Sequence, residues 1–184
     1  MSQLRMEKSD LDNVPVVTLP EGYVLRNYRE GDEAALGRVY AASSLGCETA
    51  ELVRERVIGR PCFTPARLFV IEYGGEPVGT GAAWLVEDDP GAGYLHMLGL
   101  LPEHRGKRLG AALTVAAIGY TRAEGFSRQQ LDTDDWRVPA IRLYLNLGYY
   151  PIYWDDTHPA RWEAVAKTLG RPAALVRAKD LRQQ

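Results

Sequence analysis

The stretch LGLLPEHRGKRLGAAL, residues 98–113, carries a basic cluster flanked by glycines between two regular patterns. The run that leads into it, Tyr94 to Leu100, is mostly apolar and predicts a central strand that ends before Pro102. Downstream, apolar residues recur every three or four positions from Gly106 until Gly125, which predicts a helix. The basic cluster therefore lies where a strand leads into a helix.

This junction is predicted to bind phosphate. A helix start presents main-chain N–H groups without intrahelical partners, and the helix dipole adds about half a positive charge there. Gly106 and Gly110 would let a ligand approach the main chain, because neither carries a side chain. Arg105, Lys107 and Arg108 would add full positive charges. We therefore predict a pyrophosphate site over residues 105–110.

Two common nucleotide-binding motifs do not fit the sequence. A P-loop requires Ser or Thr after its Gly-Lys pair to bind magnesium, but Arg108 follows Gly106-Lys107. A dinucleotide-binding motif requires three spaced glycines after the first strand, but Gly79-Thr-Gly81 continues into Ala-Ala-Trp84 inside a predicted strand. Both classes of nucleotide site are therefore excluded.

The rest of the chain predicts one domain of mixed α/β class. Strands are predicted where residues alternate or run apolar: 23–27, 67–73, 76–86, 128–132 and 149–154, with a tight glycine hairpin at 74–75. Helices are predicted where apolar residues recur at helical spacing: 31–40, 48–58, 139–148 and 159–169. We expect an extended or frayed N-terminal arm (1–22), an α/β domain (23–154) and a C-terminal helical extension (155–184).

Composition and charge narrow the classes of function. The 184 residues are 46% hydrophobic and 25% charged, as in ordinary globular proteins, with a net charge of −2. This balance lacks the broad basic face that nucleic-acid binding requires, so we expect no nucleic-acid partner. No run approaches the roughly 18 apolar residues of a membrane helix. Residues 1–10 also lack the apolar core of a signal peptide, so we expect a cytoplasmic protein without a membrane partner.

Metal and redox chemistry are not indicated. Cys47 and Cys62 fit neither a redox pair nor a zinc pattern, and both are expected to be reduced thiols. His96, His104 and His158 lie far apart, without the spacing of a histidine metal motif. We therefore predict no metal site.

Two motifs resemble the GCN5-related N-acetyltransferase (GNAT) superfamily. Residues 105–110, RGKRLG, are similar to its Arg/Gln-x-x-Gly-x-Gly/Ala hallmark, although Arg108 replaces the first of the two glycines. Residues 140–149, AIRLYLNLGY, resemble its second motif, Ala-x-x-x-Tyr-x-x-x-Gly-Phe. Arg137 stands where many members carry Asn, so no cofactor contact is assigned to it. The resemblance spans about residues 23–154.

The resemblance implies the fold and the reaction of that superfamily. The fold is a mixed, mostly antiparallel central sheet flanked by helices, here with the C-terminal helical extension. The reaction is direct transfer of acetyl from acetyl-CoA to a primary amine in a ternary complex, without a metal. Acetyl-CoA would bind through its diphosphate at the helix start and through its pantetheine and thioester along a bulged strand edge. The residues expected to bind it are Leu98, Gly99, Leu100, Arg105, Gly106, Lys107, Arg108, Leu109 and Gly110.

Tyr144 and His96 are the candidate catalytic residues. Tyr144 occupies the tyrosine position of the second motif, and a phenol with a pKa of about 10 can protonate the departing thiolate. Its alternative role is a core tyrosine on the apolar stripe of its helix. His96 could accept the proton of the attacking amine directly or through water. The acidic turn at 87–89 and bulk water remain alternatives for that base.

The residues around the acceptor admit several interpretations. Acidic side chains near the predicted strand ends could attract a cationic amine, although solvated loop carboxylates are the ordinary explanation. Aromatic side chains could wall an acceptor pocket or simply fill the core: Trp84, Tyr94, Trp136, Tyr150, Tyr153 and Trp154. The acceptor is expected to be a small molecule or a peptide.

Two other functions and a dimer stay open at the level of the sequence. The chain could bind acetyl-CoA as a sensor or assembly module without transferring acetyl. A structural protein could instead dock an acidic partner on its basic helix start. Dimerisation is common in the superfamily, which leaves a homodimer open.

Overall fold

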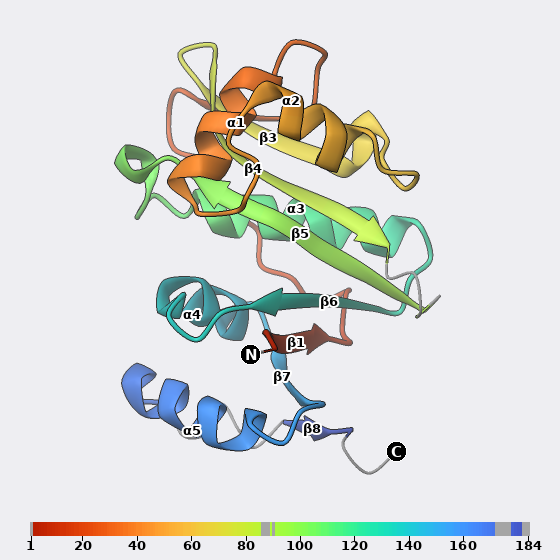
Figure 1. Cartoon of the computed structure of the whole chain (residues 1–184), viewed down its shortest axis with the longest axis vertical. Helices are drawn as coiled ribbons and strands as arrows, with labels where there is room; N and C mark the ends of the chain where they lie inside the picture. The colour runs from red at the N-terminus through yellow and green to blue at the C-terminus, as the bar shows by residue number, and fades with distance from the viewer. Residues whose placement is uncertain (1, 86–88, 90, 172–177, 182–184) are drawn as a thin grey trace.

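The computed structural model describes residues 2–85, 89, 91–171 and 178–181. Within these ranges the strands form one eight-stranded sheet in the order β2-β3-β4-β5-β6-β1-β7-β8 (Figure 1). The strands are β1 (Leu4–Lys8), β2 (Tyr23–Asn27), β3 (Leu68–Tyr73), β4 (Glu76–Leu85), β5 (Ala92–Leu100), β6 (Arg128–Thr133), β7 (Tyr150–Tyr153) and β8 (Lys179–Asp180). The pairs β5–β6 and β7–β8 are parallel and the other neighbours are antiparallel, which confirms a mixed, mostly antiparallel sheet.

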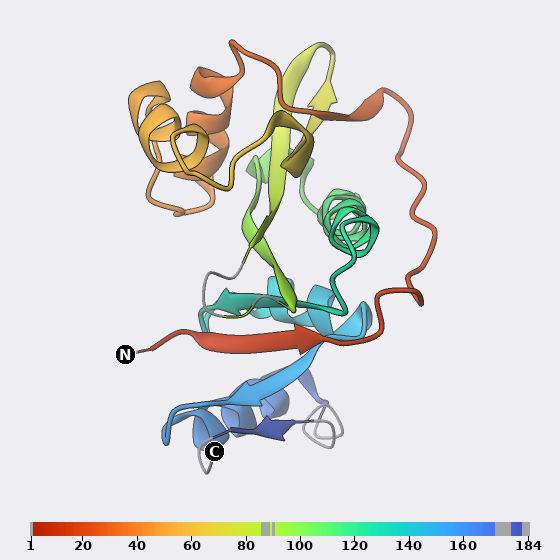
Figure 2. The ribbon, with the colours of Figure 1, turned by 90° about the vertical axis from the view of Figure 1, so that its right-hand side faces the viewer.

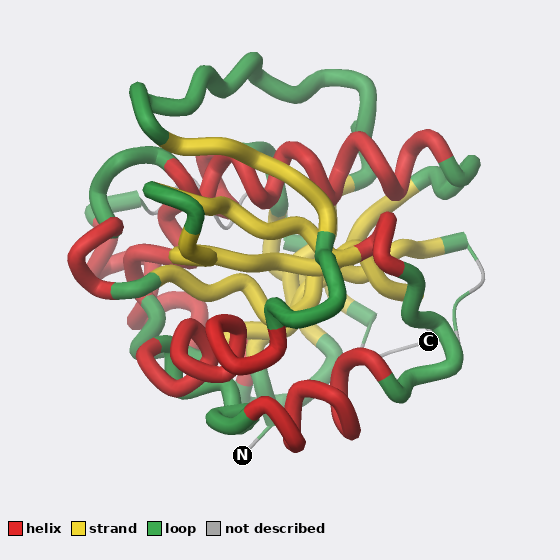
Figure 3. Tube along the Cα trace, turned by 90° about the horizontal axis from the view of Figure 1, so that it is seen from above, coloured by secondary structure: helices red, strands yellow, loops and turns green. Residues whose placement is uncertain are grey.

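Helices cover both faces of the sheet. The α-helices are α1 (Glu33–Ala42), α2 (Ala50–Val53), α3 (Leu109–Ala123), α4 (Val138–Asn146) and α5 (His158–Leu169). Three shorter elements join them: the π-helical turn η1 (Arg54–Ile58) and the 3-10 turns η2 (Pro65–Arg67) and η3 (Pro102–His104). The α1–α2 unit lies on one side of the sheet and α3 and α4 on the other (Figure 2). Seen from above, the strands run between these two helical layers (Figure 3).

Each face of the sheet has its own hydrophobic core. Side chains of a strand alternate between faces, so β3 sends Phe69 and Ile71 toward α3 and sends Leu68 and Val70 toward α1. The α3 side holds the larger cluster, in which α3 itself contributes Leu109, Leu113, Ala117 and Ile118. Burial of apolar stripes from both layers thus holds the sheet between the helices.

β5 and β6 separate after a short contact. Their parallel pairing covers only Ala92 to Tyr94 opposite Arg128 to Gln130. Beyond these pairs β5 continues along β4, and the two strands diverge toward the start of α3 (Figure 1). The sheet therefore opens at the C-terminal half of β5, where that strand has β4 as its only paired neighbour among the described strands.

A bulge lies in the same half of β5. Gly99 pairs with Thr80 and His96 pairs with Ala82, so two residues of β5 face the single residue Gly81. Met97, one of these two residues, has a φ of 54°, a left-handed conformation that is unusual for a residue other than glycine. A bulge was expected near residues 98–100, and the structure has one centred on Met97 and Leu98.

The N-terminal segment contains a strand that the sequence did not reveal. Residues 1–22 were expected to be an extended or frayed arm, but Leu4–Lys8 pairs with both β6 and β7 inside the sheet. Leu4 and Met6 are fully buried in the α3-side core, whereas Arg5 points to the other face and pairs with Asp132. The strand is stabilised by partners more than a hundred positions away, which a local pattern does not show.

Candidate functional site

The loop between β5 and α3 presents main-chain donors without partners. The N–H groups of His104 and Arg105 donate to Leu101 and Pro102, and the next main-chain bond is donated by Ala112 to Arg108. Within the described chain, the N–H groups of residues 106–111 donate no hydrogen bond. Such a row of free donors at a helix start is a site for an anionic group.

The backbone of this loop explains how the donors gather. Gly106 has a φ of 77° and Arg108, the N-cap residue of α3, has a φ of 62°. Two left-handed residues turn the chain sharply into the helix, so that successive N–H groups face the same side. A Cβ added at Gly106 would meet no atom within 4 Å, so the loop is open to a ligand there. Arg108 keeps the backbone conformation that a glycine would take at this position.

The charged side chains of the loop already have main-chain partners. Arg105 donates to the carbonyl oxygens of Leu100 and Ala42, with nitrogen–oxygen distances of 2.8 to 3.2 Å. Lys107 donates to the carbonyl of Glu103 at 2.6 Å. Both side chains are exposed, as is Arg108, so each could turn to an incoming anion.

Gly110 also has a packing role. A Cβ there would lie 3.3 Å from Cδ2 of Leu143 and 3.7 Å from Cδ1 of Leu100. The small residue lets α4 pack closely against the first turn of α3. Leu109, its neighbour, is almost fully buried in the core, so its side chain is structural and only its main chain faces the loop.

The end of β5 lies beneath the C-terminal end of α1. A Cβ at Gly99 would approach the hydroxyl of Ser43 to 2.9 Å, so this glycine permits the close contact. The N–H of Leu100 donates to the same hydroxyl at 3.1 Å. Leu98 packs on the α3-side core. The expected pantetheine edge therefore exists as a half-buried stretch of β5 that, within the described sheet, pairs only with β4, and Ser43 contacts it in this structure.

Tyr144 lies in the α3-side core on α4, one residue after the Leu143 that touches the start of α3. Its side chain is buried, and its hydroxyl forms no hydrogen bond with any described residue. Burial raises the pKa of the phenol well above its usual value, and the charge of Arg137 opposes this shift only in part. The phenol therefore stays protonated at neutral pH.

His96 faces the other side of the sheet. Its ring stacks on Trp84 at a centroid distance of 4.0 Å and lies 5.8 Å from the ring of Tyr94. Burial, together with the positive charge of Arg60, lowers its pKa to about 4. The imidazole is neutral at physiological pH, but it is a much weaker base than an alkylamine, whose pKa is about 10. Tyr144 and His96 thus belong to different faces of the sheet.

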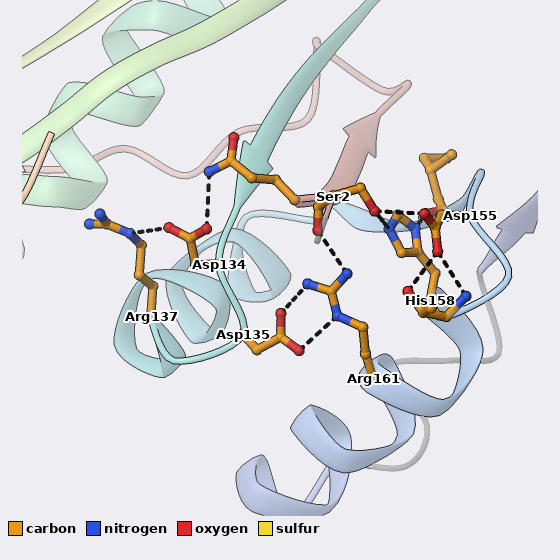
Figure 4. A network of polar contacts seen from close by, with 10 residues as sticks. Ser2, Asp134, Asp135, Arg137, Asp155, His158 and Arg161 are labelled. Atoms are coloured by element: carbon orange, nitrogen blue, oxygen red, sulfur yellow. Dashed lines mark hydrogen bonds and ion pairs between the residues drawn. The ribbon is translucent and has the colours of Figure 1, made fainter. Parts of the chain in front are cut away.

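The acidic side chains near the strand ends are mostly paired with arginines. The described pairs are Asp89–Arg128, Asp132–Arg5, Asp134–Arg137 and Asp135–Arg161, the last two shown in Figure 4. Residues 87 and 88 of the expected acidic turn lie outside the described residues. These pairs lie at strand ends and connect neighbouring elements, so their carboxylates are held by the protein's own cations.

The aromatic residues divide into core and surface. Trp84 is buried on the α1 side, and the hydroxyl of Tyr94 accepts the N–H of Asp132 at 3.2 Å. Trp136 and Trp154 are exposed, at 65% and 42% of their surface. Their exposure separates them from the buried Trp84. Sequence reasoning missed two residues near the end of β5, Ser43 and Arg137, which contact distant main-chain groups. No sequence pattern pointed to Ser43, and the only signal at Arg137 was that it replaces the Asn of many family members.

Comparison with known proteins identifies the family. The model described as "Acetyltransferase (GNAT) family" matches residues 25–149. The chain belongs to this family, and its motifs, sheet and open β5–β6 edge agree with that membership. The fold and the family expected from the two motifs are thus confirmed.

The chain is also similar to curated mycothiol acetyltransferases. It is 34% identical over 155 residues to the one from Thermobispora bispora, covering 79% of this chain and 52% of that protein. It is 35% identical over 143 residues to the one from Thermomonospora curvata, covering 74% and 47%. The chain spans about half the length of the curated relatives it matches.

Solved structures share the fold. A GCN5-related N-acetyltransferase from Sphaerobacter thermophilus has a TM-score of 0.63 at 21% identity, covering 82% of this chain and 49% of that one. Diaminobutyrate acetyltransferase from Paenibacillus lautus, solved with its substrate and coenzyme A, has a TM-score of 0.56 at 13% identity, covering 67% and 73%.

Among the described helices, each is too short or too polar to traverse a bilayer. The described residues include no group of three metal-binding side chains arranged around a common point.

Proposed function

We propose that this chain transfers the acetyl group of acetyl-CoA to the amine of a small molecule. The observation that carries the proposal is the row of free main-chain N–H groups at residues 106–111, placed where β5 and β6 diverge. Six adjacent donors with exposed cations beside them suit a diphosphate. The open edge of β5 suits the pantetheine amides, which can pair with a strand as another strand would.

The residues of this chain would divide the work as follows. The loop donors and Arg105, Lys107 and Arg108 bind the diphosphate, which positions the reacting end of the donor remotely. Main-chain groups at Leu98 and Leu100 orient the pantetheine. In the reaction, the amine nitrogen forms a bond to the acetyl carbon and the bond from that carbon to sulfur breaks.

Protons must move at two atoms. Tyr144, whose phenol remains protonated at neutral pH, gives its proton to the sulfur as the carbon–sulfur bond breaks, and it regains a proton from solvent afterwards. The proton leaving the amine goes to water or through water to the neutral His96, whose pKa of about 4 makes it a weak acceptor. A base of this strength favours water as the final acceptor of the proton.

The names of the relatives support the proposed class of acceptor. The similar curated proteins are named mycothiol acetyltransferases, which points to a small-molecule acceptor rather than a peptide. We also propose a cytoplasmic location, since acetyl-CoA is the donor. The expected absence of a nucleic-acid partner remains a prediction, and a homodimer remains open.

A thiol-release assay tests the proposal. Purified protein is mixed with acetyl-CoA and a panel of amines without thiols, from amino acids and peptide N-termini to aminoglycosides and polyamines, and free coenzyme A is measured with a thiol reagent. The proposal predicts release that depends on one class of small amine. Binding of CoA by calorimetry without release for any amine would support the sensor alternative, and an absence of CoA binding would contradict both.

A further inference from the structure

The turn at the end of α1, residues 42–44, is held by side chains from two distant segments. Arg105, from the loop before α3, donates to the carbonyl of Ala42 at 2.8 Å. Arg137, from the start of α4, donates to the carbonyls of Ser43 and Ser44 at 2.9 Å each. Ser44 has a φ of 52°, so the turn adopts a strained left-handed conformation in which its carbonyls face these two arginines.

Arg137 is itself firmly placed. Its Nε donates to Asp134 at 2.9 Å, and its guanidinium lies 4.2 Å from the ring centre of Trp136. Asp134 in turn accepts the amide of Gln3 from the N-terminal segment at 3.2 Å (Figure 4). The planar guanidinium has donors enough for the carboxylate and both carbonyls, which a lysine could not reach in this geometry. Arg137 therefore connects the end of β6 to the end of α1 across the region where β5 and β6 diverge.

The turn sits on the main chain of Leu100. The N–H of Leu101 donates to Val78 on β4, so the alternation of the strand directs the N–H and C=O of Leu100 away from β4, toward the open edge. That N–H donates to the hydroxyl of Ser43 at 3.1 Å, and that C=O accepts Arg105 at 3.1 and 3.2 Å. The protein's own side chains thus occupy both polar groups that a pantetheine amide would use at the end of β5.

We propose that Arg137 is a positioning residue that holds the 42–44 turn on Leu100, so that the turn and acetyl-CoA compete for the same main-chain groups. The inference rests on the proposed function, because the competing ligand is the coenzyme. Arg105 takes part in both the unliganded and the coenzyme-bound state. When it pairs with a diphosphate, charged oxygens replace its two neutral carbonyl acceptors and form stronger hydrogen bonds. The carbonyl of Leu100 then loses Arg105 and keeps one contact with the turn, the Ser43 hydroxyl, which donates to it at 3.4 Å.

Competition makes a prediction that simple structural damage does not. A state that blocks the ligand lowers the apparent affinity, because the intrinsic affinity is multiplied by the fraction of molecules that remain competent to bind. Removing the hydroxyl in Ser43→Ala, or the two-carbonyl contact in Arg137→Ala, should therefore tighten the binding of coenzyme A. The net value of a hydrogen bond in a protein corresponds to about a two- to ten-fold decrease in Kd.

Arg161 offers a matched control. It also pairs with a carboxylate, Asp135, and donates to a main-chain carbonyl, that of Ser2, at 2.8 Å (Figure 4). Its side chain is 13% exposed, against 20% for Arg137, but it lies on α5. Arg161→Ala should remove as much packing and charge as Arg137→Ala and leave the Kd for coenzyme A unchanged.

The experiment is calorimetric titration of coenzyme A into the four full-length proteins at a temperature where circular dichroism shows all of them folded. The inference predicts a lower Kd in Ser43→Ala and Arg137→Ala only, together with faster exchange of the Leu100 amide proton in both unliganded variants. A Kd that is unchanged or higher in Ser43→Ala overturns it, and this variant decides alone if Arg137→Ala does not fold. Failure of the wild-type protein to bind coenzyme A would refute the proposed function itself.

Discussion

Replacing Tyr144 by phenylalanine separates a catalytic hydroxyl from a structural one. If the phenol protonates the leaving thiolate, its loss should lower kcat by about 10²- to 10⁴-fold, which is the usual contribution of a positioned general acid. This corresponds to roughly 2.7 to 5.4 kcal/mol of activation free energy. The affinity for coenzyme A should stay the same, because the diphosphate site is formed by other residues.

The structure also predicts the stability of this variant. The hydroxyl of Tyr144 has no hydrogen-bond partner among the described residues, so Tyr144→Phe removes no bond. Removing a hydroxyl that has no protein partner leaves no other donor or acceptor unsatisfied, so the change in stability is small. The melting temperature should therefore stay within about 2 °C of the wild type, which for a chain of this size is less than about 1 kcal/mol.

Tyr149 provides the matched control. Its ring lies 5.8 Å from that of Tyr144, and its hydroxyl donates to the side-chain oxygen of Gln129 in the buried core. Tyr149→Phe leaves that oxygen without its donor and should cost about 1 to 3 kcal/mol of unfolding free energy. The melting temperature should fall by roughly 2 to 12 °C, while kcat at a temperature where both variants are folded stays near the wild-type value.

The assay is thiol release with the best amine from the panel, combined with thermal melts of the three proteins. A Tyr144→Phe variant that keeps the wild-type kcat would refute the general-acid assignment. If Tyr144→Phe instead melts far below the wild type, the Tyr144 hydroxyl must form a stabilising hydrogen bond that the structure lacks.

Three further perturbations test other parts of the site. The ring of His96 should titrate with a midpoint near pH 4 in NMR spectra, because burial and Arg60 disfavour its charged form, and a midpoint near 6.5 would contradict this burial. The pKa of His96 is lower in the folded state than in the unfolded state, so the unfolded state takes up a proton first as the pH falls. The free energy of unfolding should therefore decrease progressively between about pH 6.5 and pH 4. Arg108→Gly should raise the unfolding free energy by about 1 kcal/mol in denaturant titrations, since glycine adopts the left-handed conformation without strain, and a lower midpoint would count against that strain. Lys107→Glu should reduce the rise in melting temperature that coenzyme A causes, and the reduction should be larger at low salt. An unchanged rise would show that Lys107 does not contact the coenzyme. Lys107 suits this test better than Gly110, where any side chain also disturbs the packing of Leu143.

Most of the fold could be read from local patterns, because its central elements have strong ones. The β3–β4 hairpin is predicted by Gly74 and Gly75, and both have the positive φ that such a turn demands. The strand before Pro102 and the helix after Gly106 were placed within a few residues of β5 and α3. Elements whose stability depends on distant partners were missed, as with β1, whose partners lie on β6 and β7.

The site was predictable in its main chain and less so in its side chains. Free N–H groups at a helix start follow from helix geometry alone, so residues 105–110 could be selected from the sequence. The contacts of Arg105 with Ala42 and Leu100 could not, because they depend on how α1 ends against β5. The predicted helix over 48–58 starts at Ala50 as α2 and continues from Arg54 as a π-helical turn, a change of hydrogen-bond pattern that apolar spacing does not indicate.

The most direct test of the account is a crystal structure of this protein with coenzyme A bound. The account predicts diphosphate oxygens within about 2.7 to 3.2 Å of main-chain nitrogens between Gly106 and Ala111, with the pantetheine along the open edge of β5. A diphosphate bound at any other part of the molecule would contradict it.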